Sequence, residues 1–251
     1  MKNFIHLLRA AALPGFAIAL VSALAALLSG LGHRWGWWDY RLGFTVLKWA
    51  AWGGAAGMAL SLIGCIASGA SGLKRGLLLG LAGIVIGALS FGLPWSMRSQ
   101  AQGLPPIHDI TTDTVNPPQF VAILPLRKNA PNSADYAGGK IAELQKKGYP
   151  DIAPLVMEAP PGAAFDRALS AAQALSWEIV AAEPGEYRIE ATATTLMFGF
   201  KDDVVIRITP AGRGSRVDVR SVSRVGRSDL GTNARRIRAF LNSLRAQQPK
   251  T

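Results

Sequence analysis

Three long apolar segments occupy the first hundred residues of the chain. Residues 11–31, 49–67 and 77–95 carry no charged side chain. Each is close to the ~20 residues that a helix needs to cross a ~30 Å hydrocarbon core. The pattern therefore predicts a membrane domain over residues 1–98 with three transmembrane helices. The absence of charge inside the segments argues against an ion path or proton relay, because such paths need ionisable groups within the membrane.

After residue 98 the apolar runs become short and alternate with polar residues. Residues 99–118 contain two proline pairs and no periodicity, which predicts an extended linker or strap. From residue 119 onward, apolar residues recur at strand or helix spacing. We expect strands near 120–124, 177–181, 187–193, 204–208 and 217–221, and helices near 133–147, 165–172 and 229–247. Strands with polar residues on alternate positions predict an antiparallel sheet with one face covered by helices, an α+β domain over residues 119–251.

One hairpin can be placed in register, because residues 210–214 read as a turn between two alternating strands. Ile208 then lies opposite Val217, and Arg207 lies opposite Asp218. The same register pairs Ile206 with Val219 and Val205 with Arg220, and sets Asp203 diagonal to Arg220 and Arg224. We expect the apolar ladder to face the core and the charged ladder to face solvent, where such cross-strand pairs are common. A functional anion site is the alternative.

The basic excess lies mainly in the loops of the membrane half. The net charge is +11; through Gln100 the chain has eight basic residues and one acidic residue, and the remainder has 19 and 15. With the N-terminus in the cytoplasm, four basic side chains fall on each side of the membrane. Three features favour that orientation: the positive α-amine on the inside, the negative Asp39 on the outside, and the usual dominance of the first helix in setting topology. This orientation places the residues after 98 outside the cytoplasm. Cleavage of the first segment as a signal peptide would leave that side unchanged.

Glycines recur at four-residue spacing in the apolar segments. Gly53 and Gly57 form one pair, and Gly76 and Gly80 form another. Such spacing lets two helices approach closely, because no Cβ atom separates their backbones. The glycines suit either packing of the three spans within one chain or association of two copies of it.

The linker holds the candidates for chemistry, in the segment HDITTDTVNPPQF. His108, Asp109 and Asp113 offer an imidazole and two carboxylates. A metal needs ligands at fixed distances, which a proline-rich linker does not provide, so we expect neither a metal nor a cofactor. The common nucleophile, zinc, phosphate-loop and dinucleotide motifs are absent, and Cys65 is the single cysteine. The candidate ligand-binding residues are His108, Asp109, Asp113, Asp202, Asp203, Arg207, Arg220 and Arg224.

The C-terminal part of the chain is strongly basic. Residues 213–250 contain ten basic and two acidic residues. Arg235, Arg236, Arg238 and Arg245 fall off the apolar stripe of the last helix, which predicts a solvated face. No aromatic residues interleave with them, as single-strand nucleic-acid binders require, so we expect no nucleic-acid partner. Attraction to the anionic headgroups of a nearby bilayer fits better.

Four stretches of the second half carry a family resemblance. In order through residues 104–251 they are PPIHDITTDTVNPPQF, YPDIAPL, ATATTLMFGFKDDVVIRI and GSRVDVRSVSRVGRSDLGTNARRIRAFLNSL. Together they resemble the domain-of-unknown-function family number fourteen ninety-nine, in the version with a three-span N-terminus found in some Gram-negative bacteria. That family includes plastid proteins directed to the thylakoid lumen, so the resemblance implies a multi-pass inner-membrane protein with a periplasmic C-terminal domain. It implies no activity, cofactor or catalytic residue.

Two functional hypotheses follow. The first is a membrane-anchored envelope protein, not an enzyme, whose periplasmic domain binds a lipid, an envelope component or a protein partner. Its binding surface would be the exposed sheet face and the HDITTD segment. The alternative is an envelope hydrolase or transferase in which His108 and either Asp109 or Asp113 act as acid–base groups.

Overall fold

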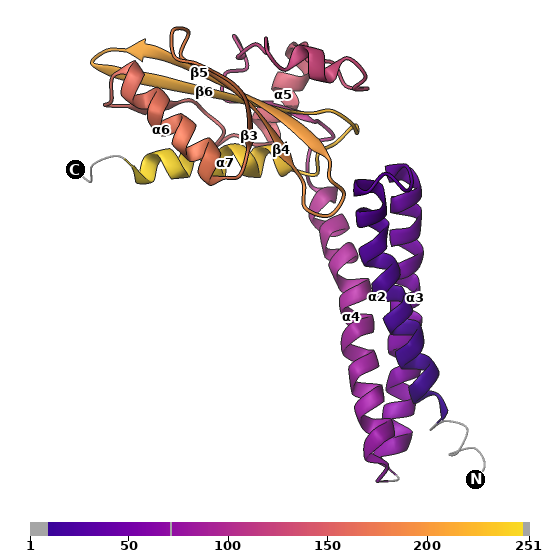
Figure 1. Cartoon of the computed structure of the whole chain (residues 1–251). Coiled ribbons are helices and arrows are strands. Elements are labelled where there is room, and N and C mark those ends of the chain that lie inside the picture. Colours follow the sequence, from indigo (N-terminus) through magenta and orange to yellow (C-terminus); the bar gives the residue numbers. More distant parts are fainter. Residues whose placement is uncertain (1–9, 71, 248–251) are drawn as a thin grey trace. The chain divides into compact units, whose positions relative to one another are not determined.

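The computed structural model describes residues 10–70 and 72–247 (Figure 1). The chain divides into two compact units. One comprises Met1–Gln102 with Leu196–Gly199, and the other comprises Gly103–Thr195 with Phe200–Thr251.

The first unit is built from three long helices. They are α2 (Ala12–Arg34), α3 (Tyr40–Gly69) and α4 (Lys74–Gln102). Each contains one of the three predicted apolar segments almost completely, and each is long and apolar enough to cross a membrane. The predicted helices are thus confirmed, and the chain has the composition of a multi-pass membrane protein.

Small residues allow these helices to pack closely. A Cβ atom on Gly57 of α3 would lie 2.6 Å from the backbone N of Ala19 on α2. A Cβ atom on Gly80 of α4 would lie 2.6 Å from the Cβ of Cys65 on α3. Gly53 and Gly76 likewise face Ser22 and Ser68, and the structure therefore uses these four glycines for packing within one chain.

The second unit is an α+β domain around one antiparallel sheet. Its strands are β1 (Asp109–Thr111), β2 (Leu155–Met157), β3 (Glu178–Glu183), β4 (Arg188–Thr194), β5 (Lys201–Ala211) and β6 (Gly214–Ser223). Its helices are the 3-10 turn η1 (Leu124–Arg127), α5 (Gly139–Gly148), α6 (Pro161–Ala174) and α7 (Thr232–Ala246). The strand order is β1-β6-β5-β4-β3, and β2 also pairs with β6. The predicted fold class is confirmed.

The hairpin β5–β6 has the predicted register. Ile208 pairs with Val217, Arg207 pairs with Asp218, and the ladder continues to Ala211 opposite Gly214. The turn needs Gly212, whose positive φ of +58° is unfavourable for a residue with a Cβ atom. The local alternation of apolar residues was therefore sufficient to place these two strands.

One face of the sheet carries the main hydrophobic core. The inward residues of β4, β5 and β6 pack against α6 and α7, and α6 runs across the strands in Figure 1. Trp177 and Phe240 stack in this core with ring centroids 5.3 Å apart. The helix expected near 229–247 is α7, and the helix expected near 165–172 is α6.

Three local expectations were wrong. Residues 120–124 form no strand; they lead into η1, because Pro125 cannot donate to a strand ladder. The helix expected at 133–147 begins only at Gly139. The short strands β1 and β2 were missed, because three residues are too few to show an alternating pattern.

The opposite face of the sheet is covered as well. Residues 112–136 cover this face. They overlap only the end of the linker expected at 99–118, and the name strap is used for residues 112–136 from here on. Phe120 and Ile123 of the strap form a second buried cluster with Val205 and Val222 of the sheet. The expectation of a solvent-facing charged ladder was therefore wrong: Asp203, Asp218 and Arg220 are at most 1% exposed.

Candidate functional site: the charged sheet face beneath the strap

Arg220 of β6 lies at the centre of the buried charged face. Its Nε and Nη2 atoms donate to the two carboxylate oxygens of Asp109 on β1, at 3.0 and 2.7 Å. Its remaining donors reach two backbone carbonyls of the strap, those of Pro118 at 3.3 Å and Ala134 at 2.7 Å. One fully buried guanidinium therefore joins the sheet to two separate parts of the strap.

Two aromatic rings of the strap enclose the same guanidinium. The Arg220 carbon Cζ lies 5.3 Å from the ring centroid of Phe120 and 5.4 Å from that of Tyr136. Both separations are within the range of a cation–π attraction. Burial and the nearby Asp109 carboxylate raise the pKa of Tyr136 to about 12, although the Arg220 charge lowers it. The Tyr136 hydroxyl is therefore neutral at physiological pH.

Glu190 of β4 anchors the start of η1. Its buried carboxylate accepts hydrogen bonds from the backbone N–H groups of Val121, Ala122 and Ile123, at 2.9–3.1 Å. Arg188, two residues earlier on the same strand, forms an ion pair with the Glu190 carboxylate. The carboxylate thus satisfies three consecutive backbone donors, of which the N–H of Ile123 is buried.

Asp203 of β5 lies between two arginines. Arg127 at the end of η1 donates to it at 2.7 Å, and Arg224 donates to both carboxylate oxygens at 2.8 Å. Thr192 of β4 adds a hydroxyl donor at 2.8 Å. Burial would raise the pKa of Asp203, but these hydrogen bonds outweigh burial, so its pKa lies below the usual value.

A fourth ionic group joins the first part of the strap to the hairpin. The Asp113 carboxylate accepts from Arg207 at 3.2 Å and from Arg216 at 2.9 Å. Both arginines also reach Asp218, at 3.1 and 3.0 Å. Although partial burial would raise the pKa of Asp113, backbone N–H donors and these two arginines lower it below its usual value.

Asp202 and His108 lie apart from this charged face. Asp202 pairs with Arg236 of α7 at 2.6 Å, on the helix side of the sheet, because adjacent strand residues point to opposite faces. Arg236 is 9% exposed in that pair, so its expected place on a solvated helix face was wrong. The His108 ring Nδ1 lies 3.4 Å from the carbonyl oxygen of Arg227.

Asp229 closes the helix side of the sheet at the start of α7. Its carboxylate accepts from the backbone N–H of Gly231 at 2.9 Å and of Asn233 at 2.7 Å. Burial nevertheless raises the pKa of Asp229, with a further contribution from Asp202. This carboxylate thus holds the first turn of α7, where the helix dipole favours negative charge.

The structure therefore divides the eight sequence-selected residues among separate contacts. Asp109 with Arg220, Asp203 with Arg224, and Asp113 with Arg207 form three pairs beneath the strap, while Asp202 and His108 lie elsewhere. Among the described residues no group of three or more metal-binding side chains comes together. Three important partners were not selected: Arg127, Glu190 and Arg236. Their only sequence signal is a charge in a loop, a strand or a helix, which surface residues share.

The strap also presents an apolar surface outward, which we call the knuckle: Val121, Leu124 and Leu126. Their exposures are 54%, 48% and 53%. Between them, Ile123 points inward and is fully buried, and Arg127 follows with its ion pair to Asp203. The charged face below thus holds the backbone of η1 in place while three apolar side chains reach solvent. Clustered exposed apolar residues are characteristic of interaction sites.

The fold and this site define a class of protein: an α+β domain whose charged sheet face is covered by its own strap, in a chain with three N-terminal helices of membrane-spanning composition. The family described as "Protein of unknown function (DUF1499)" matches residues 109–244, which is more than half of the chain. The chain belongs to that family, as the sequence resemblance indicated. A comparison with curated proteins finds no match.

Proposed function

We propose that this protein is a multi-pass protein of the bacterial inner membrane whose C-terminal domain is a periplasmic binding module, not an enzyme. In this proposal the knuckle binds a protein partner in the envelope. The observation that carries it is the contrast within the strap: Asp113 and Arg127 form internal ion pairs, whereas Val121, Leu124 and Leu126 face solvent.

The internal contacts argue against the hydrolase or transferase alternative. Both carboxylate oxygens of Asp109 accept hydrogen bonds from Arg220, and the Asp113 carboxylate forms ion pairs with two arginines. In extended backbone, His108 and Asp109 point to opposite sides of the chain, so they do not converge on one reacting atom. A rigid apolar surface favours recognition over chemistry, because few side-chain rotamers must be ordered on binding.

The surroundings of the knuckle favour a protein partner over a lipid surface. Lys128 is the single exposed basic residue of the strap, and Asp135 is exposed as well. Peripheral attachment to anionic membranes relies on several lysines and arginines beside the apolar residues. An apolar centre with a nearly neutral polar rim is typical of protein–protein interfaces.

We expect a periplasm-only reporter enzyme fused after the last residue of the full chain to be active in a Gram-negative host. The reason is the loop charge and the odd number of predicted spans, which place the domain outside the cytoplasm. The matched fusion carries a reporter that is active only in the cytoplasm, and it should be silent. The opposite pattern would place the domain inside and refute a periplasmic partner.

We expect a photo-reactive amino acid at Leu124 to capture a protein in intact cells. The same label at Gln173, which is exposed on α6, is the matched control. Adding Leu126→Asp should remove the adduct, because loss of a central apolar contact costs about 2 kcal/mol, or about 30-fold in affinity.

The identity of the adduct decides between the partner classes. A discrete protein captured at Leu124 and not at Gln173 supports the proposal. Capture of lipid alone would replace the protein partner by a membrane surface. Equal labelling at both positions would refute a binding role for the knuckle.

A further inference from the structure

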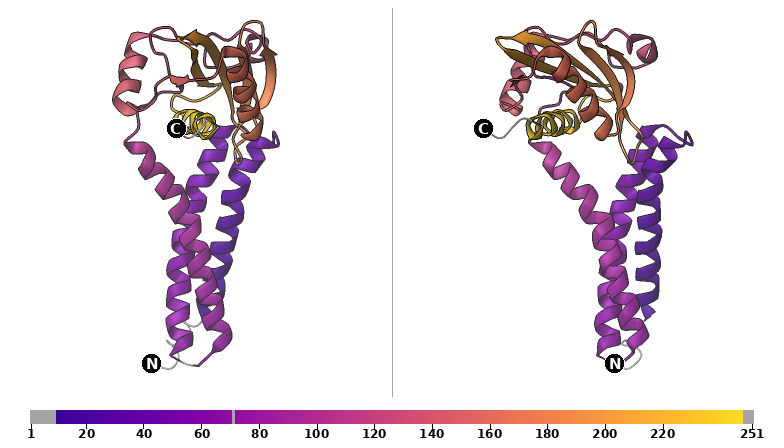
Figure 2. Two further views of the ribbon diagram at one scale, coloured as in Figure 1. Left: turned by 90° about the vertical axis from the view of Figure 1, so that its left-hand side faces the viewer. Right: turned by 60° about the vertical axis from the view of Figure 1, so that its left-hand side comes forward.

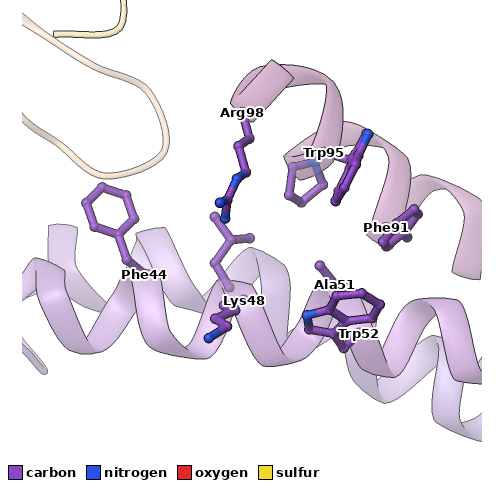
Figure 3. A pocket seen from close by; sticks show the side chains of 9 residues that line it. Phe44, Lys48, Ala51, Trp52, Phe91, Trp95 and Arg98 are labelled. Atoms are coloured by element: carbon purple, nitrogen blue, oxygen red, sulfur yellow. The ribbon is translucent and has the colours of Figure 1, made fainter. Parts of the chain in front are cut away.

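A groove lies between α3 and α4 of the first unit. It has a volume of about 280 Å³. Figure 3 shows its lining, with aromatic rings from both helices facing each other. The lining residues are Phe44, Leu47, Lys48, Ala51, Trp52, Phe91, Pro94, Trp95 and Arg98.

The change from small to large residues along α4 accounts for the groove. As far as Gly87, glycines hold α4 against α3; a Cβ atom on Gly87 would lie 2.5 Å from the carbonyl oxygen of Gly54. Beyond that point Phe91 and Trp95 occupy the facing side of α4, and the two helices diverge toward Gln102 (Figure 2). Large side chains keep the backbones apart, so the space between the helices is lined by rings and not closed by backbone contact.

The groove is apolar along its length and cationic at one end. Trp52 and Phe91 lie with ring centroids 5.9 Å apart, and Phe91 stacks with Trp95 at 5.5 Å. Arg98 extends from α4 toward α3 at the end of the groove where Lys48 lies (Figure 3). None of the lining residues is acidic, and within the described part of the chain no ion pair neutralises Lys48 or Arg98.

We propose that this groove binds one anionic phospholipid. Its phosphate lies between Lys48 and Arg98, and one acyl chain lies along Trp52, Phe91 and Trp95. Cations at the end of a spanning helix reach the headgroup level, and tryptophans are enriched at the same depth, so the two parts of the groove match the two parts of a lipid. The proposal rests on the membrane-spanning helices and is independent of the knuckle.

The test is native mass spectrometry of the full chain in mild detergent, with equal amounts of phosphatidylglycerol and phosphatidylcholine of the same acyl chains. We expect the first phosphatidylglycerol to bind about tenfold more tightly, since two cations act on its net charge. The double variant Lys48→Gln/Arg98→Gln should lose that preference. The matched control Lys74→Gln/Arg75→Gln removes the same charge from the other end of α4 and should keep it.

A second measurement needs no variant. In bilayers of the unaltered protein, brominated phosphatidylglycerol should quench tryptophan fluorescence more strongly than brominated phosphatidylcholine at the same mole fraction. Equal binding and equal quenching by the two lipids would overturn the proposal. A loss of preference as large in the Lys74/Arg75 control would overturn it as well, because it would show a general effect of charge.

Discussion

Replacing Arg220 by methionine is expected to lower the free energy of unfolding of the domain by about 3–5 kcal/mol. Arg220 is fully buried, and its guanidinium holds the Asp109 carboxylate with two hydrogen bonds and two strap carbonyls with the rest. Methionine retains much of the apolar length but none of the donors. The variant leaves a buried carboxylate without its partner, and that desolvated charge accounts for most of the loss.

Hydrogen exchange of the full chain in detergent measures this effect, read by mass spectrometry on the amides of β5 and β6. The matched control is Arg238→Met. Arg238 pairs with Asp151 at 2.6 Å, but the two side chains are 38% and 55% exposed, so we expect a loss of at most about 1 kcal/mol. Equal losses in the two variants would contradict a central role for Arg220.

A compensating change separates loss of the charge partner from loss of shape. Adding Asp109→Leu to Arg220→Met removes the orphaned carboxylate, and we expect part of the stability to return. Buried ion pairs can often be replaced by apolar residues without net cost, whereas half of a pair cannot. A double variant less stable than Arg220→Met would show that the strap carbonyls and aromatic rings account for the effect.

Asp203→Asn is expected to cost about 3–5 kcal/mol at neutral pH, because it leaves Arg127 and Arg224 beside an uncharged amide. Leaving Arg127 without a charged partner costs more than leaving Arg224 without one, since the Arg127 side chain is only 3% exposed. The strap should be released first, as its end at η1 depends on this ion pair. Exchange of the amides of η1, measured with that of the sheet, reports the order.

The loss should depend on pH in a defined direction. The folded pKa of Asp203 lies below its ordinary value of 3.8. Ionised Asp203 therefore stabilises the domain above pH 3.8, and this stabilisation disappears as the pH falls through its lower folded pKa. The difference between the original chain and Asp203→Asn should shrink only in that acidic window.

The contribution of Asp229 to stability depends on pH in the opposite direction, but it does not affect the comparison between the original chain and Asp203→Asn. Its raised pKa favours the folded state at low pH and less so as the pH rises, and it is present in both proteins. The hydrogen bond from Arg238 also lowers the pKa of Asp151, but both side chains are largely exposed, so the control Asp151→Asn should show a much smaller change with pH. A difference for Asp203→Asn that persists unchanged far below pH 3.8 would refute the assigned role of its charge.

The regular parts of this protein follow from local pattern. Apolar segments of about 20 residues predict spanning helices wherever they occur, because only an internally hydrogen-bonded helix of that length fits the hydrocarbon core. Alternation along β5 and β6 predicts their pairing as well, because a slip of one residue would turn Ile206 and Ile208 away from the core. These signals lie within a few residues of one another in the chain.

The burial of the charged face depends on contacts between distant residues. Alternation showed that Asp203 and Arg220 share the face opposite the core, and a charged face is normally solvated. The strap covers it only because Arg127 meets Asp203 from 76 residues away, and the backbone at Val121 meets Glu190 from 69 residues away. The sequence of a charged pair does not differ between an exposed ion pair and a buried one, so it does not reveal which of the two forms. The geometry that supplies each buried charge with its partners exists only in the folded chain.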